Sequence, residues 1–168
     1  MTLLKNNIIL IGMPGAGKST IGISLAKILE KKFVDTDLLI QEQQGKTLQD
    51  IVDNEGHLTL RAIEEKTLLC LNEQNHVIAT GGSAVYSDVA MFHLKTLGTI
   101  IFLDVDLPEI ITRINNFDTR GLAGRADQTF TELFNERQPL YQKYADIRIN
   151  CTGKTPEKII EEIMSLQK

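Results

Sequence analysis

Residues 12–19 form the pattern that most constrains the fold of this chain. They read Gly-Met-Pro-Gly-Ala-Gly-Lys-Ser, which matches the phosphate-binding loop G-x-x-x-x-G-K-[ST]. The apolar run at 7–11 precedes the loop and is typical of a buried strand, and residues 20–30 follow with apolar positions at helical spacing. A strand, a glycine-rich loop and a helix in this order predict the start of a P-loop α/β domain.

The chemistry of such a loop predicts a role for each of its parts. Glycines allow consecutive backbone N–H groups to face one anion, and the N-terminus of the following helix adds positive potential. Lys18 is predicted to reach the β- and γ-phosphates of a nucleotide, and the hydroxyl of Ser19 to bind Mg²⁺. The predicted nucleotide-binding residues are Gly12, Met13, Pro14, Gly15, Ala16, Gly17, Lys18, Ser19 and Thr20.

Length and composition predict a single domain with an ordinary core. The chain has 168 residues, of which 42% are hydrophobic and 24% charged. Its net charge of −4 gives no support for nucleic acid or an acidic membrane as a partner. No apolar stretch is long enough to span a membrane, and the first strand leaves no room for a signal peptide, so we expect a cytoplasmic protein. We also expect a monomer. Cys70 and Cys151 are expected to be reduced core thiols.

Strand-like and helix-like segments alternate along the rest of the chain. Strands are expected at 7–11, 33–35, 76–80, 99–104 and 146–149, and helices at 20–30, 48–52, 60–71, 108–115, from 129 onward and from 155 onward. This alternation predicts a parallel sheet covered by helices on both faces. The polar, glycine-containing stretch 116–128 is the only long candidate loop, which predicts a lid or a disordered segment.

Polar residues follow several of the expected strands, where ligands bind in open α/β sheets. Asp35 and Asp37 follow the second strand, Gly81 and Gly82 follow the third, and Asp104 ends the fourth. One carboxylate of the Asp35–Asp37 pair could approach Mg²⁺ while the other accepts a proton, although capping of a following helix is an alternative reading. Asp104 ends an apolar strand as a Walker B acid does, so the pattern leaves Asp35 and Asp104 as rival metal ligands.

Five arginines fall in segments that could face the same edge of the sheet: Arg61, Arg113, Arg120, Arg125 and Arg137. Phosphoryl transfer needs cations at the γ-phosphate, and an anionic substrate needs a bidentate partner, although a single arginine is more often an exposed surface residue. Arg120, in the expected lid, has the best position to close over phosphates. Tyr141 is expected to pack in the core.

These features occur in the order found in shikimate kinases, and the chain resembles that family over essentially its whole length. The shared elements are the loop Gly12–Thr20, Asp35-Thr-Asp37, Leu60-Arg61-Ala-Ile-Glu64, Ala79-Thr80-Gly81-Gly82-Ser83-Ala-Val85, Arg120 and Glu136-Arg137-Gln-Pro-Leu-Tyr141. The resemblance implies a three-layer α/β/α fold, similar to nucleoside-monophosphate kinases, around a five-stranded parallel sheet in the order 2-3-1-4-5. It also implies one kinase domain over 1–168, with a lid at about 116–128 and a substrate-binding helical region at about 37–64.

The resemblance implies the reaction as well. The γ-phosphoryl group of MgATP would pass to the 3-hydroxyl of shikimate, a step in the biosynthesis of chorismate and the aromatic amino acids. The catalytic residues would be Lys18, Asp37, as the base, and Arg120. Asp35 would join Ser19 at Mg²⁺, usually through water, so the resemblance favours Asp35 over Asp104 as the metal ligand.

Binding roles follow from the same resemblance. Arg113 would stack on adenine, and Arg120 would contact ATP. Apart from the resemblance, Glu64 lies three residues after Arg61 on one helix face and could orient its guanidinium. The residues that would bind shikimate are Asp37, Arg61, Gly81, Gly82 and Arg137.

Three positions depart from the family pattern. Ser83 stands where a third glycine is usual, Leu60 where phenylalanine is usual, and Gly121 where the lid usually has proline. Gly121 is expected to make the open lid more flexible, and Ser83 to add a side chain near the substrate hydroxyls. The alternative functions are a kinase for another hydroxylated carboxylic acid, such as gluconate, and a non-catalytic nucleotide-binding regulator.

Overall fold

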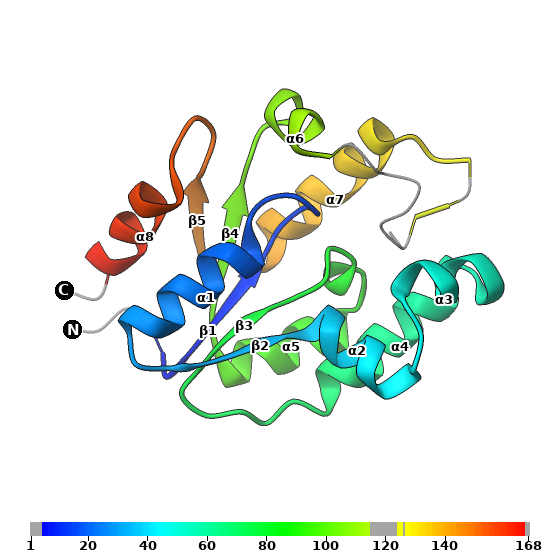
Figure 1. Cartoon of the computed structure of the whole chain (residues 1–168), viewed down its shortest axis with the longest axis horizontal. Coiled ribbons are helices and arrows are strands. Elements are labelled where there is room, and N and C mark those ends of the chain that lie inside the picture. The colour runs from blue at the N-terminus through cyan, green and yellow to red at the C-terminus, as the bar shows by residue number, and fades with distance from the viewer. Residues whose placement is uncertain (1–4, 115–123, 126, 167–168) are drawn as a thin grey trace.

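A five-stranded parallel sheet in the order β2-β3-β1-β4-β5 forms the centre of the molecule (Figure 1). The computed structural model describes residues 5–114, 124–125 and 127–166. Within these residues the strands are β1 (Asn7–Ile11), β2 (Lys32–Asp35), β3 (His76–Ala79), β4 (Gly98–Asp104) and β5 (Ile147–Asn150). The predicted sheet and its strand order are therefore confirmed.

Helices cover both faces of the sheet. The described residues form α1 (Lys18–Ile28), α2 (Thr36–Gln44), α3 (Leu48–Glu55), α4 (His57–Leu69), α5 (Asp88–Leu97), α6 (Leu107–Arg113), α7 (Phe130–Tyr144) and α8 (Pro156–Ser165). Figure 1 shows α1 and α8 on one face and α5 and α7 on the other, while α2, α3 and α4 pack together at one end of the molecule. The three-layer architecture expected for a P-loop kinase is thus present.

The sheet is buried because its central strands are apolar on both faces. Every residue of β1 and β4 is buried, as expected for parallel strands covered by helices on either side. Phe102 of β4 stacks on Tyr141 of α7, with ring centroids 5.1 Å apart. A second, smaller core of Ile40, Ile51 and Leu60 joins α2, α3 and α4.

The strand register brings four loops to one edge of the sheet. Asp35 pairs with Ala79, and Leu10 pairs with both Ala79 and Ile101, so the carboxyl ends of β1 to β4 lie next to one another. The loops that follow these ends carry the residues singled out from the sequence. This edge is where the site is built.

Two details differ from the sequence-based expectations. Helix α5 was not predicted, although the Ser87 hydroxyl caps it by accepting the Ala90 N–H at 3.1 Å. The two cysteines are free thiols, but only Cys151 is buried, whereas Cys70 is the exposed C-cap of α4. The prediction of a core thiol at Cys70 was therefore wrong. In the described part of the chain, no helix has the length and apolar character needed to cross a membrane.

Candidate active site

The P-loop connects β1 to α1 and has a backbone that requires glycine. Gly12, Gly15 and Gly17 have φ angles of 148°, 85° and 94°, which residues with a side chain rarely adopt. A Cβ atom on Gly12 would also lie 2.8 Å from the carbonyl oxygen of Leu103. The glycines of the motif therefore stand where the backbone turn needs them.

Lys18 lies in the first turn of α1, and its ammonium group is bound to its own loop. Nζ donates hydrogen bonds to the carbonyl oxygens of Gly12, at 2.7 Å, and Met13, at 2.8 Å. Burial lowers the pKa of Lys18 to about 8, and the nearby Asp37 carboxylate opposes that shift. The side chain is thus a buried cation at the mouth of the predicted phosphate site.

Ser19 and Asp35 form an oxygen pair beside the P-loop. The Ser19 hydroxyl donates to Oδ2 of Asp35 at 2.5 Å, while Oδ1 accepts the N–H groups of Asp37, at 3.0 Å, and Leu38, at 3.3 Å. Asp35 is therefore the N-cap of α2 and a partner of Ser19 at the same time. A hydroxyl with one carboxylate fits Mg²⁺, which takes few protein ligands and completes its shell with phosphate and water oxygens. The part of the chain that the structure describes holds no cluster of three or more His, Cys, Asp or Glu side chains that could hold a metal ion.

Asp104, the rival metal ligand, is engaged elsewhere. Its Oδ2 accepts a hydrogen bond of 2.7 Å from Nε of Arg148 and forms an ion pair with Nη2 of the same residue. Arg148 lies on β5, at the edge of the sheet away from Asp35. This arginine fork neutralises Asp104, which favours Asp35 as the carboxylate near Mg²⁺.

A cavity of about 280 Å³ opens beside the P-loop. It is lined by parts of the P-loop and by Asp35, Asp37, Leu48, Leu60, Glu64, Thr80, Gly81, Gly82, Ser83 and Arg137. The structure thus brings Lys18, Ser19 and both aspartates to one space with the glycine pair and Arg137. Of the residues predicted to bind the acceptor, Arg61 does not line this cavity.

Two carboxyl groups face the cavity: that of Asp37 on α2, which is half-buried, and that of Glu64 on α4, which is buried. Burial raises the pKa of Asp37 to about 6, against the opposing effect of Lys18. Burial, with the Asp37 carboxylate beside it, raises the pKa of Glu64 to about 7. A carboxylate with its pKa close to neutral is suited to accept a proton from a hydroxyl group.

The glycine pair after β3 lies directly against these charged groups. A Cβ on Gly81 would lie 2.5 Å from Oδ1 of Asp37 and 2.5 Å from Oε1 of Glu64, and a Cβ on Gly82 would lie 2.6 Å from Nη1 of Arg137. Glycine is therefore the residue that lets the carboxyl and guanidinium groups meet here. The Tyr141 hydroxyl donates to the carbonyl oxygen of Gly82 at 2.6 Å, so Tyr141 both packs, as predicted, and holds this loop.

Arg137 and Arg61 meet at Tyr86, a residue that the sequence did not single out. Nε of Arg137 donates to the Tyr86 hydroxyl at 3.2 Å, and the Arg61 guanidinium carbon lies 3.6 Å from the centroid of the Tyr86 ring. Arg137 is fully buried, and its Nη2 has no hydrogen-bond partner among the described residues. Glu64, which is expected to orient Arg61, accepts a hydrogen bond from Ser83 at its Oε2.

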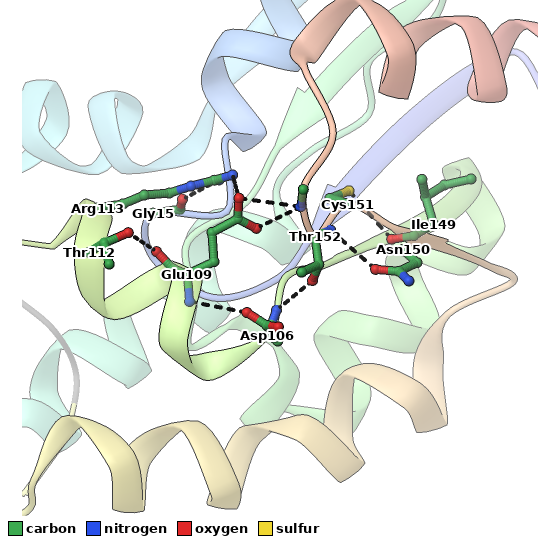
Figure 2. A network of polar contacts seen from close by, with 10 residues as sticks. Gly15, Asp106, Glu109, Thr112, Arg113, Ile149, Asn150, Cys151 and Thr152 are labelled. Atoms are coloured by element: carbon green, nitrogen blue, oxygen red, sulfur yellow. Dashed lines mark hydrogen bonds and ion pairs between the residues drawn. The ribbon is translucent and has the colours of Figure 1, made fainter.

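Arg113 lies at the end of α6 and contacts both the P-loop and Glu109 of its own helix (Figure 2). Its Nη1 donates to the Gly15 carbonyl oxygen at 3.1 Å, and its Nη2 pairs with Glu109 at 3.4 Å. The Glu109 carboxylate also accepts the N–H of Gly153 at 3.2 Å. Glu109 therefore connects Arg113, and through it the P-loop, to the loop that follows β5. No local sequence pattern indicates this connection.

Arg120 and most of the predicted lid at 116–128 lie outside the described residues. Arg125 is exposed and pairs with Asp127 at 3.8 Å, and Gln128 is buried beside Glu136. The lid and the role of Arg120 remain predictions.

The chain is similar in sequence and in fold to known kinases. The family described as shikimate kinase matches residues 14–168. A shikimate kinase from Sulfurihydrogenibium sp. is 38% identical over 160 residues, with 95% of this chain and 96% of the relative covered. A solved structure of shikimate kinase from Acinetobacter baumannii in complex with shikimate has a TM-score of 0.88 and 30% identity, with 96% and 92% of the two chains covered. A thymidylate kinase from Candida albicans, with a TM-score of 0.55 and 19% identity over 98% of this chain and 92% of its own, shares the fold alone. The chain belongs to the shikimate kinase family.

Proposed function

We propose that the chain transfers the γ-phosphoryl group of MgATP to the 3-hydroxyl of shikimate, which gives shikimate 3-phosphate. The observation that carries this proposal is the shared cavity: Lys18 and Ser19 of the P-loop line the same space as Asp37 and Arg137. The proposed sites for the phosphoryl donor and for a hydroxylated anion would thus be adjacent. The bound shikimate of the Acinetobacter baumannii relative supports the choice of acceptor.

On the donor side, the P-loop backbone and Lys18 would hold the phosphates. Mg²⁺, bound by Ser19 and through water by Asp35, would neutralise charge that develops on the transferred group. Arg113, which donates a hydrogen bond to the Gly15 carbonyl oxygen, would stack against the adenine ring. Arg120 would approach the phosphates as the lid closes and water is excluded.

On the acceptor side, Asp37 would accept the proton of the attacking hydroxyl. Its half-buried position in the cavity and its pKa of about 6 suit a general base that works near neutral pH. The free Nη2 of Arg137 would bind the shikimate carboxylate, with Arg61 completing the clamp. Gly81 and Gly82 would let the ring hydroxyls approach the backbone closely.

An ADP-release assay with a panel of acceptors tests this proposal. Shikimate, quinate, gluconate and a control without acceptor are each supplied with MgATP. We expect shikimate to be used with the highest kcat/KM and the control to release almost no ADP. Faster turnover of gluconate would support a kinase for another hydroxylated acid, and no acceptor-dependent ADP release at all would support a nucleotide-binding regulator.

The proposal includes the expected setting of the enzyme. We expect a cytoplasmic monomer that binds ATP and a small carboxylate and that interacts with neither nucleic acid nor a membrane. Light scattering on a sizing column gives the mass in solution. A mass near 18.8 kDa supports a monomer, and twice that value would contradict it.

A further inference from the structure

Ser83 and Glu64 form a buried hydrogen-bonded pair in the wall of the cavity. Ser83 is 8% exposed and follows the glycine pair, and Glu64 is 3% exposed and lies on α4. The Ser83 hydroxyl donates to Oε2 of Glu64. The other oxygen, Oε1, is buried and has no hydrogen-bond partner among the described residues.

The unpartnered oxygen faces the proposed acceptor. Oε1 of Glu64 and Oδ1 of Asp37 each lie 2.5 Å from the position that a Cβ on Gly81 would take. Both side chains line the cavity together with Arg137, whose Nη2 is likewise unpartnered. A buried acceptor atom and a buried donor atom, both without partners and at one cavity, are costly unless a ligand satisfies them.

We propose that Ser83 is a positioning residue, which binds Oε2 of Glu64 so that Oε1 is presented to the acceptor beside Asp37. A carboxylate that rotates about its terminal bond has no preferred oxygen, and a hydroxyl bound to one oxygen removes that freedom. Ser83 therefore acts through Glu64 and does not itself touch the reacting atoms. The inference rests on the proposed function, because it concerns the same acceptor site.

The electrostatic surroundings agree with this arrangement. Asp37 of α2 faces Glu64 and, together with burial, raises its pKa, whereas Arg137 of α7, Lys18 of the P-loop and the Ser83 hydrogen bond act in the opposite direction. Loss of the Ser83 hydroxyl should therefore raise the pKa of Glu64 further. This gives a readout that a loss of packing alone would not produce.

The test compares Ser83→Ala with the wild type in kinetics and in NMR. We expect the KM for shikimate to rise about 3–10-fold, the worth of one positioned hydrogen bond, with the KM for ATP unchanged. In the Glu64→Ala background the same substitution should have no further effect, because no side-chain oxygen is left at position 64 for Ser83 to bind. The titration midpoint of the Glu64 carboxyl carbon, assigned by its loss in Glu64→Gln, should move to higher pH.

Ser87→Ala is a matched control. Ser87 donates a hydrogen bond of 2.5 Å to Oε2 of Glu65, the residue that follows Glu64 on α4. Ser87 does not line the cavity. Because Ser87 also caps α5, its removal should lower stability and leave the KM for shikimate unchanged. An unchanged Glu64 titration in Ser83→Ala, or an equal rise in KM with Glu64 already replaced, would overturn the inference. The NMR titration needs no turnover, so a failure of the proposed acceptor would be seen separately, in the wild-type kinetics.

Discussion

The Ser19 hydroxyl donates a hydrogen bond of 2.5 Å to Oδ2 of Asp35, which joins the start of α1 to the start of α2. The other oxygen of Asp35 accepts the Asp37 N–H at 3.0 Å and so sets the first turn of α2. One carboxylate thereby connects the phosphate loop to the helix that carries the proposed base. The proposed metal site and the proposed base would therefore be placed by the same local structure.

Asp35→Asn should weaken the use of Mg²⁺ while leaving the fold intact. Asparagine caps a helix about as well as aspartate does, so α2 should persist, but the charge near the metal is lost. We expect the Mg²⁺ concentration for half-maximal activity to rise about tenfold or more. Asp104→Asn is the matched control, because its partner is Arg148. A larger shift in Asp104→Asn would show that the Walker B pattern identifies the metal ligand.

Asp37→Asn should lose turnover and gain stability. Without a base, kcat should fall roughly 10²–10⁴-fold with little change in the KM for ATP. Burial raises the folded-state pKa of Asp37 from 3.8 to about 6, so ionisation costs stability as the pH rises through this range. Removing the charge should raise the free energy of unfolding by about 1–3 kcal/mol at pH 8.

The pH dependence of that gain is its control. At about pH 3, below the unfolded-state pKa of 3.8, the carboxyl group is largely protonated in both the folded and the unfolded chain, so the gain should nearly vanish there. Urea denaturation at both pH values measures it. Asp53→Asn, at an exposed position of α3 outside the cavity, is the control for the same replacement. An Asp37→Asn protein less stable than the wild type at pH 8 would contradict the buried charge.

Arg137 and Arg61 should be needed for binding the acceptor carboxylate. Arg61→Ala and Arg137→Lys should each weaken the interaction with the carboxylate by about 1.5–3 kcal/mol. The KM for shikimate should therefore rise roughly 10–150-fold, with the KM for ATP nearly unchanged. Lysine at 137 keeps the charge but lacks the second donor of the fork. Steady-state kinetics on variants with native circular dichroism measure both effects.

Shikimate methyl ester tests the same clamp without any mutation. The ester keeps the ring and its hydroxyls but lacks the negative charge. The wild-type enzyme should use it with a much higher KM. Equal use of the ester and the acid would show that these arginines do not bind a carboxylate.

Glu109 should affect nucleotide binding through Arg113 and the loop after β5. Glu109→Ala removes both the ion pair with Arg113 and the hydrogen bond from Gly153, so the KM for ATP should rise about 3–10-fold. Glu109→Gln, which keeps an acceptor for Gly153, should have a smaller effect. Glu162→Gln breaks a neighbouring ion pair with Lys154, 2.7 Å long, and should change neither KM. A change in the KM for shikimate with no change in the KM for ATP in Glu109→Ala would refute this role.

The parts of the fold that are local in sequence could be predicted. The P-loop is one continuous segment whose glycines are required by its own backbone, and β1 and β4 are continuous apolar runs. The order of the strands came from the resemblance, because pairing between distant strands leaves no local pattern. Helix α5 was missed, although Ala90, Met91 and Leu94 are buried at helical spacing.

The parts of the site that depend on distant partners could not be predicted. Nothing near Asp104 indicates that Arg148, 44 residues later, occupies its carboxylate. Tyr86 meets both arginines only because the 3₁₀ turn Ala84–Tyr86 brings its ring against them. Helical spacing suggested that Glu64 could orient Arg61, but it gave no sign that Ser83, 19 residues later, donates a hydrogen bond to Glu64.

The position of the transferred phosphate tests the central claim most directly. The product formed from MgATP and shikimate is purified and examined by proton–phosphorus correlation NMR. Our account predicts a single phosphate monoester whose phosphorus couples to the proton on carbon 3, with Asp37→Asn giving almost none of it. A phosphate coupled to the proton on carbon 4 or 5, or free phosphate released with no phosphorylated ring, would contradict the account.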